Sequence, residues 1–476
     1  MKSPAPMIML EFNELSPVLM DQFMAEGKLP NFSRLRAESQ AYVSEAEEIA
    51  PNLEPWIQWI TVHTGLAYKQ HGIFDLGDGH KLGYPTAYEL LSEAGRKIWI
   101  CASMNASFRT PPHGFFLPDP WSVGVEPYPK GEFEDYFDYV CRNVQEHSRD
   151  KMVMSKSDHA KFLAFMLRHG FSATTVKAII KQLSTERGGK FRWKRAVLLD
   201  QMQWDVFVHY WKKERPDFST FFINSTAHFQ HMYWRNMDPS PFKIQPSAEE
   251  QAEYRDAILF GYESMDKIIG QCLDKLGPDT VVVLATALSQ QPCLTYEDKS
   301  GKILYRANEP DEFFAFAGIK SQYRYAPVMS EQFHLYFKEE TDAAEGEQLL
   351  RAMKVGDRDL MYVKRDGQEV FAGCTIFQQT DRQAVVTAAN GETRHFGQIF
   401  YQASGLKSGM HHPDGILWIR DRAKQPTAME AVKERVSLRQ VAPTVLAHFG
   451  LEKPDFMNLE ALPGYRLRMA ARAASA

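Results

Sequence analysis

The sequence predicts an α/β fold in which a mostly parallel central sheet is flanked by helices on both faces. Short, mostly apolar runs recur along the chain, as buried parallel strands require. Between them lie segments with apolar residues at three- and four-residue spacing, which is typical of amphipathic helices. This alternation favours parallel strands joined by helices. A chain of 476 residues is also long enough to bury a large core.

The expected elements can be placed in order along the chain. Ser16 and Pro17 have the character of an N-cap and first residue of a helix that runs to about Ala25. The longest helical pattern covers Ser247–Leu276, and a last helix is expected from Ser437. The strands are expected at Met7–Glu11, Lys97–Ala102, Phe218–Asn224, Thr280–Thr286 and Gly415–Ile419.

Two insertions interrupt this pattern. The first is rich in aromatic and charged residues at helical spacing, so we expect a helical insertion. The second shows two-residue alternation with turns at Asp366-Gly367 and Asn390-Gly391, which predicts a mixed, β-rich cap subdomain. The expected division is 1–129, 216–294 and 406–476 for the α/β core, 130–215 for the helical insertion and 295–405 for the cap.

Composition argues against several classes of protein. Hydrophobic residues make up 44% of the chain and charged residues 24%, which is ordinary for a globular protein. The formal net charge of −5 gives no basic excess that would favour nucleic acid. No apolar run reaches the roughly 18 residues that a membrane-spanning helix needs. We therefore expect no nucleic-acid partner and no membrane span.

The cysteines and the N-terminal residues indicate the cellular compartment in which we expect the protein. The five cysteines are scattered and contain no Cys-x-x-Cys pair, which favours a reducing compartment and argues against a disulfide scaffold. The N-terminal residues lead directly into a strand pattern and lack a signal-peptide pattern. We expect a cytoplasmic protein, and a homo-oligomer is left open.

Three segments, each close to a predicted strand end, carry the informative motifs. They read PNLEPWIQWITVHTGLAYKQHGIF over 51–74, INSTAHFQHMYWRNMDP over 223–239 and VVVLATALSQQP over 281–292. In this order they resemble the alkaline phosphatase superfamily, and the nearest branch is the nucleotide pyrophosphatase/type I phosphodiesterase enzymes. The resemblance implies an alkaline phosphatase-like fold. It covers about residues 5–125, 216–292 and 406–460.

Enzymes of that branch bind two metal ions and attack a phosphoester with a Thr or Ser. Aligned on the resemblance, this chain keeps two of the family's metal ligands, His231 and His411. Pro55 occupies the position of the nucleophile, and proline has neither a nucleophilic atom nor a backbone N–H. The other four ligand positions hold Asn13, Ala227, Thr286 and Ala287.

Two imidazoles cannot hold two divalent ions, since such sites need several carboxylates. The resemblance therefore implies at most one divalent transition metal, which would be zinc, manganese or iron. Three nitrogen or oxygen ligands and an open position describe a catalytic single-metal site. We expect His231 and His411 as ligands with His412 beside them. His228, Glu11 and Glu54 are alternatives for the third position.

The candidate catalytic residues are Glu54, Glu11 and His228. Glu54 directly precedes Pro55 and could act as base, ligand or nucleophile, or could instead be a carboxylate stabilised by a helix dipole. His228 lies three residues before His231, so on a helix the two imidazoles would share a face, although one of them could instead be a hydrogen-bonded core histidine.

Polar residues at the same strand ends complete the expected cleft. Asn13 is flanked by Glu11 and Glu14. Either glutamate could replace the missing acidic ligand if the backbone register shifts, and Glu14 could also be a solvated turn residue. The residues expected to bind substrate are Asn13, Gln230, Thr286 and Gln290.

Two functions are consistent with these residues. The first is a remodelled enzyme that acts by transfer or hydrolysis on a phosphorylated, sulfated or nucleotide-linked small molecule or glycan. The second is a pseudoenzyme that binds a ligand or protein partner through the same cleft. A structural role in a complex, through the aromatic-rich residues 130–215, is a third alternative. New His and Glu residues beside the old site favour the enzyme.

Overall fold

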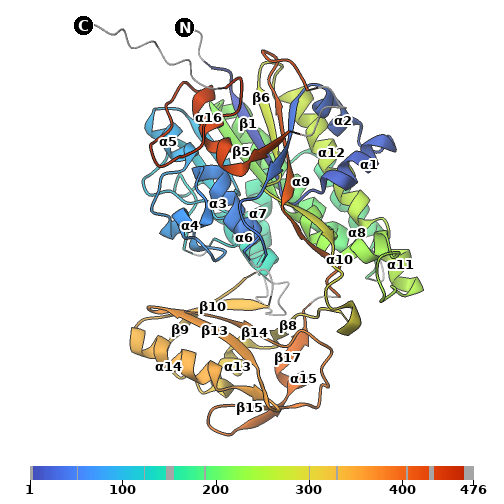
Figure 1. Cartoon of the computed structure of the whole chain (residues 1–476), viewed down its shortest axis with the longest axis vertical. Coiled ribbons are helices and arrows are strands. Elements are labelled where there is room, and N and C mark those ends of the chain that lie inside the picture. Colours follow the sequence, from blue (N-terminus) through green and yellow to red (C-terminus); the bar gives the residue numbers. More distant parts are fainter. Residues whose placement is uncertain are drawn as a thin grey trace.

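The computed structural model describes residues 4–50, 52–122, 124–145, 155–186, 189–299, 301–328, 331–403, 406–427 and 434–465. An eight-stranded sheet forms the centre of the upper part of the molecule in Figure 1. Its strands are β1 (Met7–Phe12), β2 (Gln40–Glu45), β3 (Ile98–Cys101), β4 (Gly114–Leu117), β5 (Phe218–Ile223), β6 (Val281–Ala285), β19 (Asp414–Arg420) and β20 (Arg435–Ser437).

The strand order is β20-β2-β19-β6-β1-β5-β3-β4. β6, β1, β5, β3 and β4 are parallel to their neighbours in this series, whereas β19 is antiparallel to both β6 and β2. The predicted fold class is therefore confirmed: the sheet is mostly parallel, and the returning strand β19 makes it mixed.

The central strand β1 divides the hydrophobic core into two halves. All six of its residues are buried, and successive side chains point to opposite faces. Ile8, Leu10 and Phe12 belong to one hydrophobic cluster, while Met7 and Met9 belong to the other. Helices must therefore cover both faces of the sheet.

Figure 1 shows these two helical layers on either side of the sheet. The first cluster takes in α1 (Pro17–Ala25), α2 (Pro30–Ala37), α9 (Arg195–Glu214), α10 (Ser225–Met237) and α12 (Ala257–Lys275). The second takes in α3 (Pro55–Thr64), α5 (Ala87–Glu93) and α16 (Val441–His448). The helical pattern over 247–276 forms two helices, because a turn at residues 255–256 separates α11 (Ala248–Tyr254) from α12.

Three helices of the insertion precede α9: α6 (Glu134–Gln145), α7 (Lys156–Arg168) and α8 (Ala173–Thr185). Aromatic residues bind them to the sheet. The ring of Phe133, just before α6, stacks on Trp99 of β3, and Tyr136 of α6 stacks on Phe162 of α7. The insertion thus shares the hydrophobic core of the sheet.

A second, smaller body lies below the sheet in Figure 1 and has its own hydrophobic core, which runs from Ile303 to Phe400. Its antiparallel sheet has the order β13-β14-β10-β9, and α13 and α14 lie against it. Its elements are β8 (Tyr305–Ala307), α13 (Pro310–Ala317), β9 (Tyr323–Pro327), β10 (Gln332–Phe337), α14 (Glu340–Arg351), β11 (Lys354–Val355), β12 (Arg358–Asp359), β13 (Met361–Asp366), β14 (Glu369–Cys374), β15 (Val385–Thr387), β16 (Thr393–His395), α15 (Phe396–Ile399) and β17 (Phe400–Gln402).

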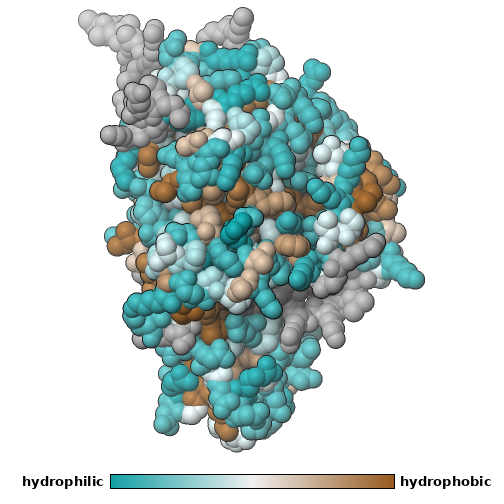
Figure 2. Space-filling view, turned by 90° about the vertical axis from the view of Figure 1, so that its right-hand side faces the viewer, coloured by the Kyte–Doolittle hydropathy of each residue, from teal (hydrophilic) through white to brown (hydrophobic). Residues whose placement is uncertain are grey.

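We call this body, residues 303–403, the cap. The two predicted turns join β13 to β14 and β15 to β16, and Gly367 and Gly391 supply the positive φ angles that these turns need. The face of the whole molecule that Figure 2 shows is mainly hydrophilic. Within the described residues, the helices are too short or too polar to cross a membrane.

Charged residues hold the cap against the core. Lys81, at the end of the short helix η1 (Asp78–Lys81), donates to Glu369 of β14 at 2.7 Å and contacts Asp78 at 3.0 Å. Glu369 also lies 2.5 Å from Nδ1 of the buried His334. Burial alone would raise the pKa of Glu369, but His334 and Lys81 hold it at about 2. The carboxylate therefore stays ionised and links the two bodies.

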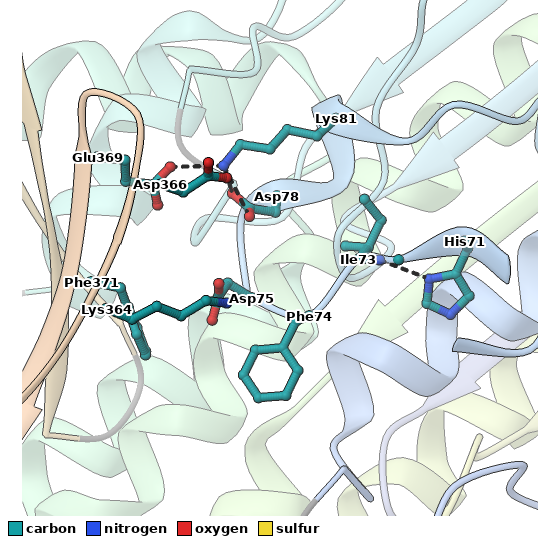
Figure 3. A pocket seen from close by; sticks show the side chains of 11 residues that line it. His71, Ile73, Phe74, Asp75, Asp78, Lys81, Lys364, Asp366, Glu369 and Phe371 are labelled. Atoms are coloured by element: carbon teal, nitrogen blue, oxygen red, sulfur yellow. Dashed lines mark hydrogen bonds and ion pairs between the residues drawn. The ribbon is translucent and has the colours of Figure 1, made fainter. Parts of the chain in front are cut away.

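A cavity of about 230 Å³ lies beside this contact, between residues 71–81 of the core and the β13–β14 hairpin (Figure 3). His71 lines the cavity, and its Nδ1 accepts a hydrogen bond from the backbone N–H of Ile73 at 3.1 Å. Nδ1 therefore carries no proton, and the imidazole is neutral. Burial lowers the pKa of His71 to about 4.

We expect His71 to make the protein less stable in mild acid. A neutral folded imidazole with a pKa of about 4, against about 6.5 when unfolded, binds fewer protons than the unfolded chain between those pH values. Stability is then lost as pH falls from 6.5 toward 4, by roughly 2 kcal/mol between pH 7 and pH 5. Urea unfolding of wild type and His71→Asn at both pH values measures this loss.

The Asn variant should lose about 2 kcal/mol less than wild type over this interval, since its amide does not titrate and its oxygen can still accept from Ile73. His113→Asn, at an exposed histidine, is the control and should keep the wild-type pH dependence. Equal pH dependence of wild type and His71→Asn would contradict the neutral, buried state of His71.

Candidate functional site

Polar residues gather where the central parallel strands end. β1, β5 and β6 are in register, so Phe12, Ile223 and Ala285 bring their carboxyl ends to one edge of the sheet. Ligands of open α/β sheets bind at this edge. Two residues beyond β1, Glu14 has a φ of 60°, in the left-handed region. A non-glycine residue there is strained by about 1–2 kcal/mol, and such strain is typical of functional sites.

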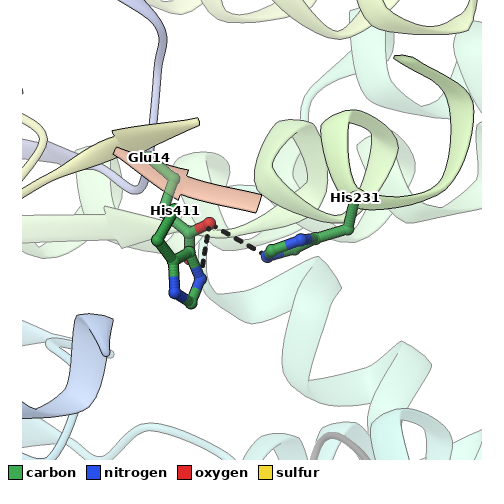
Figure 4. Close-up of side chains that lie close together, drawn as sticks. All are labelled: Glu14, His231 and His411. Carbon is green, nitrogen blue, oxygen red and sulfur yellow. Dashed lines mark ion pairs between the residues drawn. The ribbon is translucent and has the colours of Figure 1, made fainter. Parts of the chain in front are cut away.

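Glu14 lies between two histidines that come from distant parts of the chain (Figure 4). Its Oε2 is 3.0 Å from Nε2 of His231, on α10, and 3.3 Å from Nε2 of His411, on β18 (Gly409–His412). β18 pairs with β7 (Ser289–Pro292), which follows β6. The three side chains are wholly or largely withdrawn from solvent.

Both imidazoles face hydrogen-bond acceptors on both sides. Nδ1 of His231 is 3.1 Å from the carbonyl oxygen of Gly409, and Nδ1 of His411 is 2.7 Å from that of Leu53. A carbonyl only accepts, so each Nδ1 must carry a proton, and the neutral ring then points an Nε2 lone pair at the Glu14 carboxylate. That arrangement is repulsive unless a cation, either a second proton or a metal ion, lies between nitrogen and oxygen.

The pKa shifts of these groups follow from their burial and mutual charges. Burial acts to raise the pKa of Glu14, but His411 and His231 outweigh it, and the pKa lies well below its usual value. Burial lowers the pKa of His231 more than Glu14 raises it. For His411 the charges of Glu14 and Glu54 outweigh burial and raise the pKa. The carboxylate is thus ionised, and His231 resists a second proton.

The donor set suits one divalent transition metal. One ligand atom from each of Glu14, His231 and His411 lies within 4.8 Å of the other two. Two imidazoles and a carboxylate are ligands that zinc, iron and manganese accept, and Nδ1–H donated to a carbonyl is the usual support of a metal-binding histidine. Among the described residues this is the one such group of three. The structure therefore supports the single-metal expectation, with Glu14 as the third ligand.

Amide side chains hold Glu14 in place. Asn13 donates to its Oε1 at 2.8 Å and accepts from Trp59 Nε1, while Gln290 donates to its Oε2 at 2.5 Å. Gln230 donates to the backbone carbonyl of Glu14 at 2.7 Å. These three amides were expected to bind substrate. Because they are fully buried and bonded to the protein, the structure makes them supports of Glu14 instead.

Other expected site residues lie away from this group. Glu11 is fully buried on the face of β1 that Met7 and Met9 share, and it faces His63 at 3.2 Å. The structure thus places it in the core and not in the cleft. Thr286 is also buried, and its hydroxyl accepts from the backbone N–H of Ile416 at 2.8 Å, so it does not face a ligand.

Two further histidines expected at the site also lie outside the group of three. His228 lies on α10 with His231, but its side chain is exposed and does not join the group around Glu14. His412 follows His411 along β18, and alternation along a strand sends it to the opposite side, where its Nδ1 accepts from the N–H of Asp414 at 3.1 Å. Within the described residues, the group of three that could hold a metal ion contains Glu14 and not His412.

Glu54 lies beside the group formed by Glu14, His231 and His411, and is more exposed to solvent than these three residues. It is the N-cap of α3, with Pro55 as the first helical residue, and its Oε2 is 3.5 Å from Nδ1 of His411. Its side chain is 28% exposed, so a ligand can reach it. Burial raises the pKa of Glu54, although His411 and Lys407 act to lower it. A carboxyl group whose pKa is raised accepts a proton more readily than one in water.

Sequence reasoning named Glu14 only as one of two glutamates that could replace the missing acidic ligand, and did not include it among the alternatives for the third ligand. Its signal was its position in a polar turn directly after an apolar strand, next to the Ser-Pro start of a helix. Lys302 and Lys407, whose charges act on Glu54, were not singled out at all, since no motif contains them.

Comparison with known proteins identifies the family. The family model described as type I phosphodiesterase / nucleotide pyrophosphatase matches residues 7–298, which is more than half of the chain. A comparison with curated protein sequences gives no match.

Solved structures resemble the chain over nearly its whole length. Human ectonucleotide pyrophosphatase/phosphodiesterase 5 has 8% identity and a TM-score of 0.44, and the similarity covers 94% of this chain and 96% of that one. Phosphonoacetate hydrolase from Sinorhizobium meliloti 1021 has 12% identity and a TM-score of 0.43, and the similarity covers 94% of this chain and 96% of that one. A mutant of the alkaline phosphatase PafA has 12% identity and a TM-score of 0.47, and the similarity covers 97% of this chain and 99% of that one. By the match of the family model, the chain belongs to the type I phosphodiesterase/nucleotide pyrophosphatase family.

Proposed function

We propose that this protein is a single-metal hydrolase that cleaves a phosphoester bond of a small molecule or glycan, with water as the nucleophile. The observation that carries the proposal is the pair of imidazoles, His231 and His411, which each need a cation between Nε2 and the Glu14 carboxylate. These three residues would hold one divalent ion. When bound, the ion supplies Lewis-acid stabilisation of charge on the phosphoryl oxygens.

The residue that the resemblance aligns with the family's nucleophile supports attack by water. Under the resemblance, Pro55 stands at that position, and as the first residue of α3 it offers no side-chain oxygen. The second metal's ligand positions hold Thr286 and Ala287, both fully buried, and the Thr286 hydroxyl is bonded to backbone. A covalent phosphoryl-enzyme intermediate and a second metal ion are therefore not part of the proposed mechanism.

Glu54 is the proposed general base. It takes a proton from the attacking water as the new P–O bond forms, the ester P–O bond breaks, and the departing alcohol oxygen takes a proton from solvent. Its place at the N-terminus of α3 and its raised pKa support this role. His411 positions Glu54 through the 3.5 Å contact between Nδ1 and Oε2.

Turnover of a panel of aryl phosphodiesters, phosphomonoesters and sulfate esters tests the proposal. The protein is purified without chelators and assayed with added zinc, manganese or iron(II). We expect hydrolysis of at least one phosphoester, lost on EDTA treatment and restored by metal. Glu54→Gln should lower kcat about 10²–10⁴-fold, as for a lost general base. Glu93→Gln, at an exposed glutamate of α5, should match wild type.

Metal binding without turnover of any ester would replace the enzyme by a ligand-binding pseudoenzyme with the same cleft. Turnover unaffected by Glu54→Gln would remove Glu54 as the base. A burst of product equal to the enzyme concentration would point to a covalent intermediate and contradict attack by water.

A further inference from the structure

The charges of two lysines, Lys302 and Lys407, act on Glu54, which contacts His411 of the group formed with Glu14 and His231. Lys302 and Lys407 lie on the two segments that connect the core to the cap. The backbone N–H of Lys407 donates to the carbonyl of Lys302 at 3.2 Å, so the segments run side by side at this point. The next residue, Ser408, donates its N–H to the carbonyl of His231 at 2.7 Å. The lysine pair is thus tied to the helix that carries His231.

Lys407 lies two residues before Gly409, the first residue of β18, and Gly409 and His411 lie on one side of that strand. Gly409 adds no side chain between Lys407 and His411. A Cβ at this position would lie 2.3 Å from Oε1 of Gln290 and 2.4 Å from the carbonyl oxygen of Gln230. The charge of Lys407 acts on His231, His411 and Glu54 alike, which agrees with this placement.

The two ammonium groups are not neutralised by ion pairs. Both lysines are only partly exposed, and within the described part of the chain no carboxylate oxygen lies within 4.0 Å of either Nζ. The Lys302 ammonium lies 4.4 Å from the centre of the Phe377 ring instead. Burial and the charge of Lys407 lower the pKa of Lys302, and Glu331 and Glu54 offset this only in part. Two like charges on neighbouring backbone segments repel each other less when an anion binds to both.

We propose that Lys302 and Lys407 bind a second anionic group of the ligand, a phosphate, sulfate or carboxylate that lies beside Glu54. This inference rests on the proposed function for the reacting end of the ligand. The substrate is then a phosphoester that carries at least one further negative group. The lysines lie on the connections to the cap, so the cap takes part in choosing the substrate.

Anion binding measured without turnover tests the lysine pair by itself. The full chain is titrated calorimetrically with sodium sulfate and, separately, with sodium acetate, both as purified and after dialysis against EDTA. We expect sulfate to bind in both preparations. Lys302→Gln and Lys407→Gln should each weaken sulfate binding about tenfold, the loss of one charge-assisted hydrogen bond. Lys407→Arg, which keeps the charge, should stay within about threefold of wild type.

Lys320→Gln, at an exposed lysine of the cap, is the matched control and should not change the affinity. Sulfate binding with no acetate binding identifies a tetrahedral oxyanion as the second group, and binding of acetate of similar strength identifies a carboxylate. Sulfate binding that disappears with EDTA, or that survives in the Lys302→Gln/Lys407→Gln double variant, would overturn the proposal. Absence of metal or of turnover would overturn the proposed function and leave the sulfate result standing.

Discussion

Replacing Glu14 by glutamine is expected to weaken zinc binding at least a hundredfold. The carboxylate is the one charged ligand in the group and the only residue there that contacts both imidazoles. Removing it leaves two neutral nitrogens to hold a dication, and loss even of outer supports of a metal ligand costs 10–100-fold in affinity. Zinc competition with a chromophoric chelator, at fixed pH, measures the affinities of wild type and Glu14→Gln.

Neighbouring histidines provide the matched controls. His231→Ala and His411→Ala should weaken zinc binding as strongly as Glu14→Gln. His412→Ala should stay within about threefold of wild type, because the next residue of the strand points away from the group. Equal losses for His411→Ala and His412→Ala would mean that the ligand set is misassigned. Absence of zinc binding by wild type would contradict the metal site itself.

Replacing Glu297 by alanine is expected to destabilise the protein by about 3–5 kcal/mol, because it leaves a buried charge without its partner. Glu297 lies in the short helix η3 (Glu297–Lys299) and contacts Arg235 of α10 at 2.5 Å, with both side chains about 5% exposed. Its second oxygen accepts from the backbone N–H groups of Lys243 and Ile244, each at 2.9 Å. Urea unfolding of wild type and variant measures the loss.

The adjacent residue supplies the control for this measurement. Asp298 also pairs with a basic residue, Lys243, but both side chains are mostly exposed, so Asp298→Ala should change stability little. Glu297→Gln keeps the shape and the hydrogen-bond acceptor and should lose less than Glu297→Ala. If Glu297→Ala and Asp298→Ala cost the same, burial does not set the strength of the Arg235 pair.

The pair of Glu297 and Arg235 can also affect the candidate metal site, because His231 lies on the same helix, one turn before Arg235. A Glu297 variant that remains folded at 25 °C but binds zinc more weakly would show that the pair positions His231. Normal zinc affinity in such a variant would confine the pair to stability.

Much of the fold could be predicted from the sequence because its signals are local. Each apolar run expected as a strand, such as Phe218–Asn224, forms a strand within one or two residues, since a buried parallel strand must be apolar on both faces. Direction was harder to predict. β19 is antiparallel to both of its neighbours, β2 and β6. The residues GILWI do not predict this direction, because it depends on where the chain returns to the sheet after the cap.

The site divides in a similar way. His231 and His411 were placed at the cleft from sequence, because each belongs to a motif near a strand end. Glu11 was assigned to the same cleft, although two-residue alternation places it on the face of β1 that Met7 and Met9 share, where it contacts His63. The same alternation, applied to 409–412 as a strand, places His411 and His412 on opposite sides.

The sequence by itself thus determined the α/β fold class, the edge of the sheet where the polar residues gather and two of the three residues of the candidate metal site. Only the tertiary structure decided the rest. Glu14 reaches the histidines because its backbone adopts a left-handed conformation after β1. The residue type of a glutamate does not predict a positive φ angle. The buried amides became supports, and Lys302 and Lys407 came together, because contacts between residues far apart in the chain exist only once the chain has folded.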